Sequence, residues 1–145
     1  MVIGVTAGSF DVTHAGHILM FKECKKYCSH LIVCLQSDPT IDRPEKNKPI
    51  QTIDERLIIL NSIKYIDEVI VYNTEKELYE LLKKINPGVR IIGADWKDKD
   101  FTGNDLPIKT IFNSRNHKFS SSELRERIWK AEQIKRLGGM IKNGR

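Results

Sequence analysis

Two histidines three residues apart, His14 and His17, are the residues whose types and spacing most directly suggest chemistry. They follow a strand-like apolar run, residues 2–7, and stand where a helix is expected to begin, so both rings lie on one side of its first turn. Gly16 between them lets the backbone approach a ligand. Because a helix N-terminus offers unpaired amides and a favourable dipole to anions, the pair predicts a phosphate site whose imidazole N–H groups stabilise charge in a transition state.

A run of serines farther along the chain is a second feature that suits phosphate. Ser120 to Ser122 are expected to open a helix, where hydroxyls and free amides converge, and Arg115 or Arg125 would add charge-assisted hydrogen bonds. Taken alone, the run before Glu123 is more often a plain helix cap. The chain has neither the GxGxxG fingerprint nor the GxxxxGKS/T loop, which excludes those two phosphate sites.

Strand-like segments alternate with helix-like ones, and this order is typical of an α/β fold with a parallel sheet. Five segments are rich in β-branched residues and almost continuously apolar, which indicates strands covered on both faces: 2–7, 31–36, 68–72, 89–93 and 108–112. Two sets of residues repeat at helical spacing and predict helices that pack on the sheet: His17, Phe21, Cys24 and Cys28, then Leu78, Leu81, Leu82 and Ile85. Ligands are expected beyond the carboxyl ends of the strands.

Helix ends and loops are also marked in the sequence. A hydroxyl followed three residues later by glutamate predicts reciprocal helix caps at Thr52 with Glu55, Thr74 with Glu77, and Ser120 with Glu123. Asn86-Pro87-Gly88 predicts a helix stop. The irregular stretches 37–51 and 97–107 are expected to be functional loops, and residues 137–145 a frayed tail.

Length and composition favour one globular domain. The chain has 145 residues, 40% hydrophobic and 30% charged, which suits a single core. The longest apolar run in the helical region, residues 57–60, is far shorter than the roughly 20 residues that span a bilayer, and the sequence opens as a strand rather than a signal peptide. A cytoplasmic protein is therefore expected. The three cysteines lack metal-site spacing and are expected to be buried thiols.

Positive charge gathers at the C-terminal end. The net charge is +5, and from Arg115 onward there are nine basic and three acidic residues. Such an end suits an anion, either nucleic acid or a phosphorylated small molecule, and charge alone leaves both open. The basic end lacks interleaved aromatic residues beyond Trp129, which argues against a nucleic-acid-binding module. A catalytically inactive nucleotide sensor is a further alternative.

Four segments, in order along nearly the whole chain, resemble the HxGH nucleotidyltransferase superfamily and its cytidylyltransferase-like branch. The first is a glycine-rich opening that contains both histidines, the second a helix start with an arginine, the third a G-x-D-W sequence, and the fourth the arginine and serine segment. In this chain they read Gly8-Ser9-Phe10-Asp11 with His14-Ala15-Gly16-His17, Asp54-Glu55-Arg56, Gly93-Ala94-Asp95-Trp96, and Arg115-Asn116-His117-Lys118-Phe119-Ser120-Ser121-Ser122.

The resemblance implies a single Rossmann-like domain over residues 1–136, with a parallel five-stranded sheet and a flexible basic tail over 137–145. It implies transfer of CMP from CTP to a phosphomonoester, with glycerol 3-phosphate giving CDP-glycerol as the expected case and pyrophosphate released. Mg²⁺ is expected to bridge the triphosphate, with its protein ligands unassigned. A homodimer without nucleic-acid or membrane partners is expected.

The resemblance also assigns roles to residues of this chain. A catalytic role is implied for His14, His17, Lys46 and Arg56. Nucleotide binding is implied for Gly8, Ser9, Phe10, His14, Gly16, His17, Gly93, Asp95, Arg115, Ser120, Ser121 and Ser122. Substrate binding is implied for Asp11, Lys48, Arg56 and Trp96. The family keeps a mobile lysine over the phosphates, and the resemblance leaves Lys46 and Lys48 as alternatives for it.

Departures from the family pattern leave the nucleotide open. Lys118 stands where cytidylyltransferases have glycine, and Ser121 and Ser122 stand where they have threonines. Adenylyltransferases that form ADP-heptose share the histidine core and carry an acidic-rich loop that residues 97–103 partly resemble. Trp96 and Arg115 favour CTP, so ATP is the alternative nucleotide.

Overall fold

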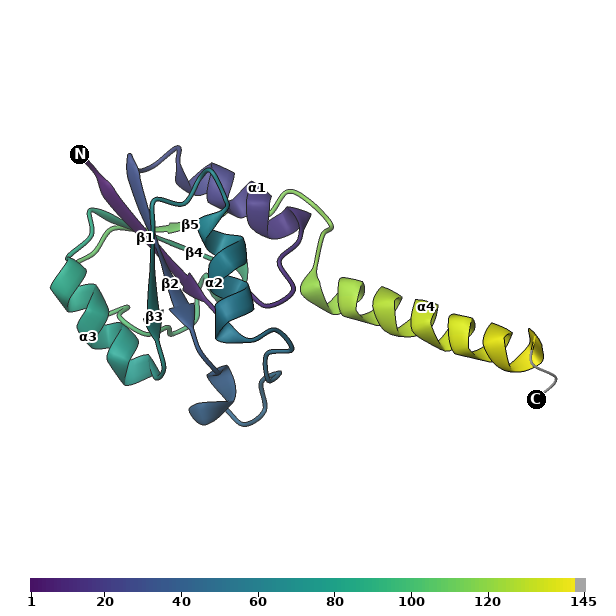
Figure 1. The fold of residues 1–145 in the computed structure, drawn as a ribbon. Coiled ribbons are helices and arrows are strands. Elements are labelled where there is room, and N and C mark those ends of the chain that lie inside the picture. Colours follow the sequence, from purple (N-terminus) through teal and green to yellow (C-terminus); the bar gives the residue numbers. More distant parts are fainter. Residues whose placement is uncertain (143–145) are drawn as a thin grey trace.

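The computed structural model describes residues 1–142 of the chain. Five strands alternate with helices as the sequence predicts, and α4 leaves the body of the molecule (Figure 1). The elements are β1 (Ile3–Gly8), α1 (Ala15–Cys24), β2 (His30–Gln36), the 3₁₀ helix η1 (Pro39–Ile41), α2 (Ile53–Asn61), β3 (Glu68–Tyr72), α3 (Glu75–Ile85), β4 (Val89–Ile92), the 3₁₀ helix η2 (Ala94–Trp96), β5 (Thr110–Phe112) and α4 (Ser121–Lys142).

All five strands pair in parallel, in the order β3-β2-β1-β4-β5. β1 is central, with Gly8 opposite Leu35 of β2 and Val5 opposite Arg90 of β4. The chain first builds outward through β2 and β3, then crosses back to the other side of β1. The order therefore reverses between β1 and β4, and a ligand crevice is expected at the carboxyl ends of these two strands.

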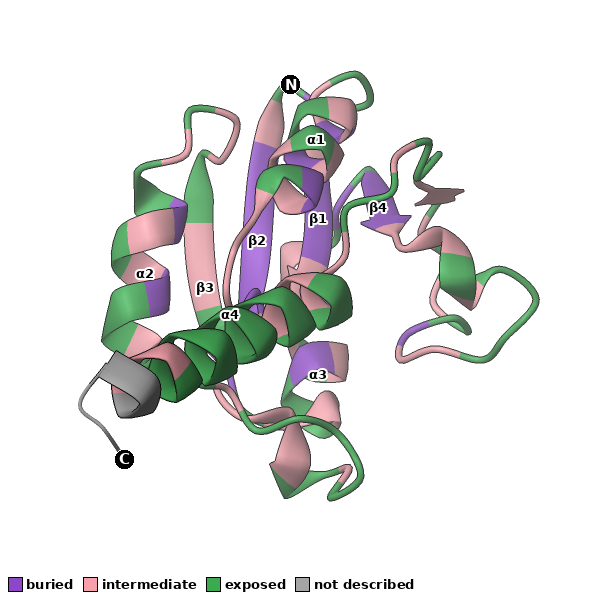
Figure 2. Ribbon diagram, turned by 90° about the vertical axis from the view of Figure 1, so that its right-hand side faces the viewer, coloured by how far each residue is buried: buried purple, intermediate pink, exposed green. Residues whose placement is uncertain are grey.

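Helices cover both faces of the sheet (Figures 1 and 2). On one face Phe21 of α1 and Leu60 of α2 are fully buried against Leu31, Val33 and Leu35 of β2. On the other face Leu78 and Leu82 of α3 join a cluster that contains Val5 and Tyr72, so the predicted apolar face of α3 is confirmed. The two layers hold the carboxyl ends of the strands rigidly.

The cysteines are buried thiols, as expected. Cys24 and Cys34 are fully buried, Cys28 is 7% exposed, and all three are free. Burial raises the pKa of the Cys24 and Cys34 thiols to about 12 in each case. Because the thiolate is the reactive form, these side chains serve packing rather than chemistry.

Of the three predicted reciprocal caps, one forms with both hydrogen bonds, and the other two keep only the bond from the glutamate amide to the hydroxyl. At the start of α4 this bond joins the Glu123 amide to the Ser120 Oγ at 3.1 Å. Thr52 and Glu55 cap α2 reciprocally, with both hydrogen bonds at 3.1 Å. At α3 the Thr74 hydroxyl accepts from the Glu77 amide, but the Glu77 carboxylate accepts from the Asn73 amide instead of the Thr74 amide. The helix α3 ends at Asn86, whose left-handed conformation fits the predicted stop.

The helix α4 continues farther than the sequence predicts. A frayed tail was expected from residue 137, whereas the helix runs to Lys142; residues 143–145 lie outside the described part of the chain. Ion pairs one turn apart, Glu126 with Lys130 and Glu132 with Arg136, add to its stability. Each such pair is worth about 0.2–0.5 kcal/mol, which is less than the cost of about 1 kcal/mol that each glycine adds within a helix.

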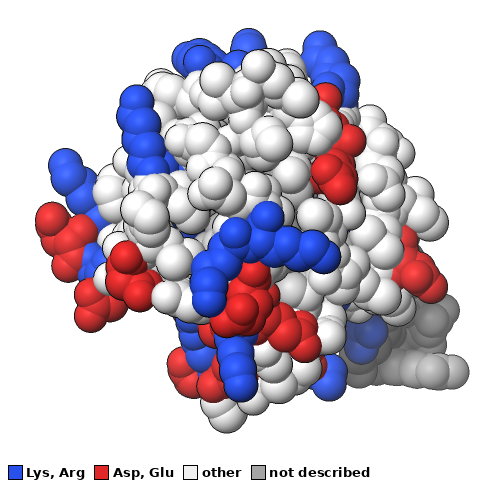
Figure 3. All heavy atoms as spheres, turned by 90° about the vertical axis from the view of Figure 1, so that its left-hand side faces the viewer, with Lys and Arg blue, Asp and Glu red and all other residues white. Residues whose placement is uncertain are grey.

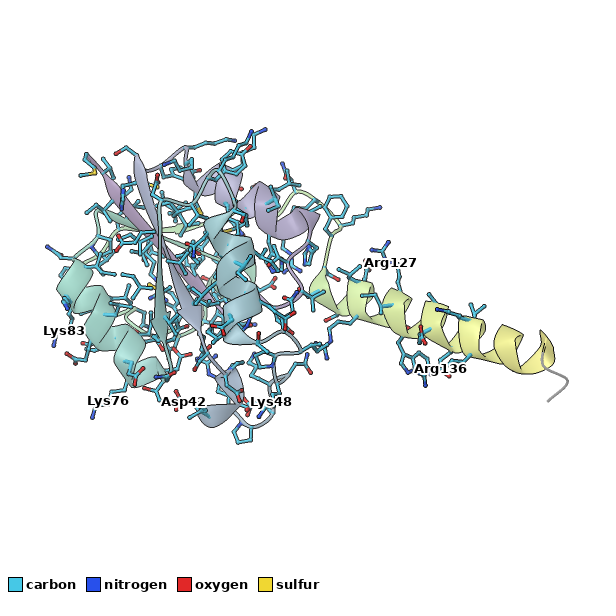
Figure 4. The ribbon with its side chains drawn as sticks, viewed as in Figure 1. Asp42, Lys48, Lys76, Lys83, Arg127 and Arg136 are labelled. Atoms are coloured by element: carbon cyan, nitrogen blue, oxygen red, sulfur yellow. The ribbon has the colours of Figure 1, made fainter. Side chains whose placement is uncertain are left out.

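Beyond its first turns α4 has few neighbours within the described chain. Trp129 is 61% exposed and Ile134 is 72% exposed. Arg127 and Arg136 project from opposite sides of this helix, away from the sheet (Figure 4). On the face drawn in Figure 3, lysines and arginines are interspersed with acidic side chains, without a continuous basic surface. Among the described helices, none has the length and apolar character needed to cross a bilayer.

Candidate functional site

Three hollows adjoin one another at the carboxyl edge of the sheet. The histidine hollow, about 270 Å³, is lined by His14, His17, Gly93, Arg115, His117 and Ser120, among others. The central hollow, about 120 Å³, shares His17 and Ser121 with it and adds Asp11, Ser122 and Arg125. The arginine hollow, about 400 Å³, shares Ser9 and Asn47 with the central hollow and is lined by Arg43, Lys46, Glu75, Arg90, Trp96 and Phe101. The central hollow therefore joins the other two.

The histidine pair caps α1 and fixes its own tautomers. The His14 Nδ1 accepts from the Gly16 amide at 3.0 Å, and the His17 Nδ1 accepts from the His14 amide at 3.1 Å. A nitrogen that accepts from an amide carries no proton, so the proton of each neutral ring is on Nε2. The His14 Nε2 lies 3.0 Å from the Ser121 Oγ, while the His17 Nε2 has no hydrogen-bond partner among the described residues.

Both rings are neutral at physiological pH. Burial lowers the pKa of His17 to about 4, with smaller contributions from His14 and His117. Burial also lowers the pKa of His14, with His117 as the second cause. The site therefore presents neutral N–H donors, and the His17 Nε2–H is available to a phosphate oxygen in the adjoining hollows.

Gly16 has a steric role that the sequence did not reveal, and its predicted part in ligand approach stays a prediction. A Cβ at this position would lie 2.9 Å from the Cε1 atoms of both His14 and His117. The glycine thus makes room for two imidazole rings, rather than for a ligand alone. His117 lies within the Arg115–Ser122 segment, but sequence reasoning did not single it out, because nothing in its local spacing places it beside α1.

The loop between β1 and α1 has an unusual backbone. Phe10 and Val12 have φ values of 45° and 50°, and this conformation is costly for a β-branched residue such as Val12. The Val12 amide donates to the Gln51 Oε1 at 2.8 Å, and the Thr13 hydroxyl donates to the Phe10 carbonyl at 3.2 Å. The predicted phosphate-binding loop, with Gly8 and Ser9, is therefore held in one strained conformation.

Asp11 holds the loop that precedes α2. Its carboxylate oxygens accept from the Ile50 and Gln51 amides, each at 2.9 Å, and Arg125 of α4 lies 3.7 Å away. The side chain also lines the central hollow. Its predicted part in substrate binding stays a prediction, whereas its structural role is evident from these bonds.

The Arg56 guanidinium is fully engaged in hydrogen bonds to backbone carbonyls. The Arg56 side chain is 2% exposed and donates to the carbonyls of Gln51, Ser9, Gln36 and Ser37 at 3.2, 2.9, 2.8 and 2.7 Å. These bonds tie the ends of β1 and β2 to the start of α2. A guanidinium satisfied in this way is a positioning group, and the structure does not bring it to any of the three hollows.

The two lysine alternatives separate clearly. Lys46 lines the arginine hollow. Lys48 lies 3.5 Å from Asp38, its side chain is 78% exposed, and it is at the outer edge of the same loop (Figure 4). Lys46 is also exposed, but it lines a hollow of the site whereas Lys48 does not, so Lys46 is the better candidate to cover phosphates, and that role stays a prediction.

Trp96 and Arg115 line different hollows, and Asp95 is not among the lining residues of any of the three. Asp95 and Arg115 form an ion pair, and Arg115 lines the histidine hollow with Gly93. Trp96 lies in the arginine hollow, where the Arg43 guanidinium is 5.8 Å from its ring centroid. Trp96, for which substrate binding was predicted, therefore lines the arginine hollow and not the histidine hollow.

The sequence motifs did not predict most of the residues that line the arginine hollow. Its polar lining includes Arg43, Glu75 and Arg90, which belong to none of the four motifs. The Glu75 carboxylate pairs with Arg43 at 3.2 Å and accepts from the Thr102 hydroxyl at 2.8 Å. Only the tertiary structure brings these elements together. The one usable signal was Arg90, a charged residue inside an otherwise apolar strand.

No set of three or more metal-ligating side chains occurs in the part of the chain that the structure describes. Asp11 is the one carboxylate among the residues of the central hollow. Mg²⁺ is commonly held by one or two carboxylates together with substrate phosphates. The site thus fits a cation that arrives with a triphosphate, with Asp11 as its protein neighbour.

Comparisons with known proteins identify relatives of this chain. The chain is 35% identical over 102 residues to the bifunctional protein HldE of Aliarcobacter butzleri, covering 70% of this chain and 21% of that protein. It is 33% identical over 91 residues to the FAD synthase of Thermococcus sibiricus, covering 63% of this chain and 62% of that enzyme. The chain thus spans about a fifth of the HldE proteins that it matches.

A solved structure confirms the fold. The lipopolysaccharide core biosynthesis protein from Thermoplasma volcanium superposes with a TM-score of 0.58 at 24% identity, over 91% of this chain and 89% of that one. The family model described as cytidylyltransferase-like matches residues 5–127, which include all four motifs and the lining of all three hollows. The chain therefore belongs to the cytidylyltransferase-like family.

Proposed function

We propose that the protein transfers a nucleotidyl group from a nucleoside triphosphate to a phosphomonoester. The observation that carries the proposal is the central hollow, which joins the histidine hollow to the arginine hollow and places His17 between them. A nucleotide in the first hollow and an acceptor in the second would meet with their phosphates in the central one. The N-terminus of α4, with Ser121 and Ser122 in the lining, adds a favourable helix dipole there.

The reaction needs no covalent intermediate on the protein. An oxygen of the acceptor phosphate attacks the α-phosphorus in line, and the bond from that phosphorus to the bridging oxygen breaks as pyrophosphate leaves with the electron pair. His17 donates its Nε2–H to a phosphate oxygen, and His14 holds Ser121 at the start of α4. Lys46 adds positive charge from the acceptor side. Bound Mg²⁺ would neutralise charge on the triphosphate. Catalysis of this kind consists mainly of positioning and charge stabilisation.

CTP is the first candidate nucleotide, and the family description supports it. ATP is the second candidate, and two observations favour it. Relatives include an FAD synthase, whose product contains an adenylyl group. In addition, Trp96, which favoured CTP in the sequence, lies outside the histidine hollow. Glycerol 3-phosphate is the acceptor that the sequence resemblance proposes.

A pyrophosphate-release screen tests the proposal. All four nucleoside triphosphates are paired with a panel of phosphomonoesters that includes glycerol 3-phosphate, with Mg²⁺ present. We expect kcat/KM for CTP above that for ATP, and Lys118→Gly is expected to leave CTP use intact. A clear preference for ATP would reassign the nucleotide, and no turnover with any pair would refute the proposal.

The homodimer expected from the resemblance stays a proposal. Light scattering after size-exclusion chromatography measures the mass in solution, and a monomer across the accessible concentration range would refute it.

A further inference from the structure

Two buried guanidinium groups lie near the site, and they differ in how they are satisfied. Arg56 donates four hydrogen bonds to backbone carbonyls. Arg90 is also buried, at 5% exposure, but it makes a single hydrogen bond among the described residues, to the Thr102 carbonyl. Its Nε is buried without a partner. A buried donor left unpaired destabilises the folded protein, and more so when it is charged.

Glu75 favours the Arg90 charge from a distance, but no carboxylate of the described residues pairs with it directly. Burial lowers the pKa of Arg90, but a guanidinium remains protonated in proteins. Phe101 lies over it, with the ring centroid 5.2 Å from Cζ. The cation thus lies between an aromatic ring and the sheet, in the lining of the arginine hollow.

The other charges of the hollow do not neutralise Arg90. Arg43, Lys46 and Arg90 contribute three positive charges, while Glu75 contributes the one carboxylate among the lining residues. That carboxylate is engaged by Arg43, by Thr102 and, at 3.4 Å, by Gln36. The lining thus carries an excess of positive charge, with Arg90 buried, Arg43 half-buried and Lys46 exposed, and an anionic ligand would complete this arrangement.

The position of Arg90 separates it from the reacting phosphates. Arg90 is paired with Val5 of β1, three residues before Gly8 at the end of that strand. At about 3.3 Å per residue, its backbone lies roughly 10 Å behind the point where β1 reaches the central hollow. An acceptor whose phosphate lies in the central hollow would therefore bring its far end, and not its phosphate, toward Arg90.

We propose that the acceptor is a phosphomonoester with a second acidic group at its far end, and that Arg90 receives this group. The inference rests on the proposed function and specifies its substrate class: a carboxylate or a second phosphate on a compact, hydroxylated carbon chain. Arg90 acts through charge-assisted hydrogen bonds from its unpaired donors. Glycerol 3-phosphate has a neutral far end and would leave them unpaired.

Matched acceptors test this directly. 6-Phosphogluconate and sorbitol 6-phosphate have the same chain length and differ at the far end by a carboxylate in place of a hydroxymethyl group. Fructose 1,6-bisphosphate and fructose 6-phosphate make the same comparison for a phosphate. We expect kcat/KM for the acidic member of at least one pair to exceed that of the neutral member by about tenfold or more. Equal values within both pairs would overturn the inference.

A variant of Arg90 tests whether this residue causes the preference for an acidic acceptor. Arg90→Met removes the charge, and we expect it to lower kcat/KM for the preferred acidic acceptor by about 10- to 100-fold through KM, with a loss at least about fivefold smaller for the neutral member. Arg136→Met, on the exposed part of α4, alters net charge equally and is the matched control. Circular dichroism monitors the fold, and the comparison within the wild-type pairs decides the matter if Arg90→Met does not fold. Unchanged discrimination in a folded Arg90→Met protein would overturn the assignment.

Ligand binding without turnover separates this inference from the proposed function. Thermal shift of the wild-type protein with each of the four acceptors, in the absence of nucleotide, reports binding alone. Stabilisation by an acidic member that exceeds its neutral partner and is lost in Arg90→Met supports the acidic-ligand site even when no pyrophosphate is released. Equal stabilisation by both members of each pair contradicts it.

Discussion

The histidine hollow and the arginine hollow lie on either side of the end of β1, and they are built in opposite ways. Much of the histidine hollow comes from two short sequence segments, around His14 and around Arg115, and its histidines are neutral donors whose tautomers are fixed by backbone amides. The arginine hollow draws single residues from many elements and carries an excess of positive charge. One side thus presents oriented N–H groups to phosphates, whereas the other presents three cations, of which Arg90 is buried.

The largest expected effect is on the histidine side. Replacing His17 with asparagine keeps an acceptor near the Nδ1 position, and so keeps the helix cap, but removes the Nε2–H. We expect kcat to fall by about 10² or more with the fold intact, because a transition-state donor is lost. His14→Asn is expected to act similarly by releasing Ser121.

Steady-state kinetics measure this effect, with circular dichroism as the check on folding. Near-normal kcat in both folded variants would contradict the assignment of catalysis to the histidine hollow and of acceptor binding to the arginine hollow.

The next effect concerns stability at the base of the site. Arg56→Ala leaves four buried carbonyls without their donor, so we expect the free energy of unfolding to fall by about 3 kcal/mol or more. Urea denaturation measures it. Arg90→Met is the matched comparison, because removal of an unsatisfied buried cation is expected to cost much less. A loss equal to that of Arg56→Ala would show that Arg90 is also a structural clamp.

Acid is expected to destabilise the histidine side selectively. The pKa of His17 is about 4 in the folded protein and about 6.5 in the unfolded chain, so the unfolded state binds more protons between these values. The stability contribution is complete above pH 6.5 and is lost as pH falls toward 4, with a slope from His17 of up to about 1.4 kcal/mol per pH unit.

Urea denaturation at a series of pH values tests this prediction against His17→Asn, which cannot titrate. A stability curve of the same slope for wild type and variant would contradict a neutral, buried His17.

The smallest effects distinguish the two lysines at the edge of the arginine hollow. Lys46→Ala is expected to lower kcat/KM by about tenfold, since it removes a cation near the phosphates. Lys48→Ala removes an exposed partner of Asp38 and is expected to change kcat/KM by less than about twofold. If steady-state kinetics show a larger loss of kcat/KM in Lys48→Ala than in Lys46→Ala, then Lys48 rather than Lys46 covers the substrate in the working enzyme.

The sequence by itself determined the fold class and most of the histidine side. The strand-helix alternation predicted the parallel sheet, and the spacing of His14 and His17 located the site at the start of α1, because these signals are local and repeat at fixed periods. Tertiary structure decided the rest. It showed Arg56 held by carbonyls of β1, β2 and the following loop, it placed His117 beside Gly16, and it separated Lys46 from Lys48. It also gathered Arg43, Glu75 and Arg90 into one hollow. Local patterns cannot report such contacts, since they depend on which distant segments the strand order brings to the same edge of the sheet.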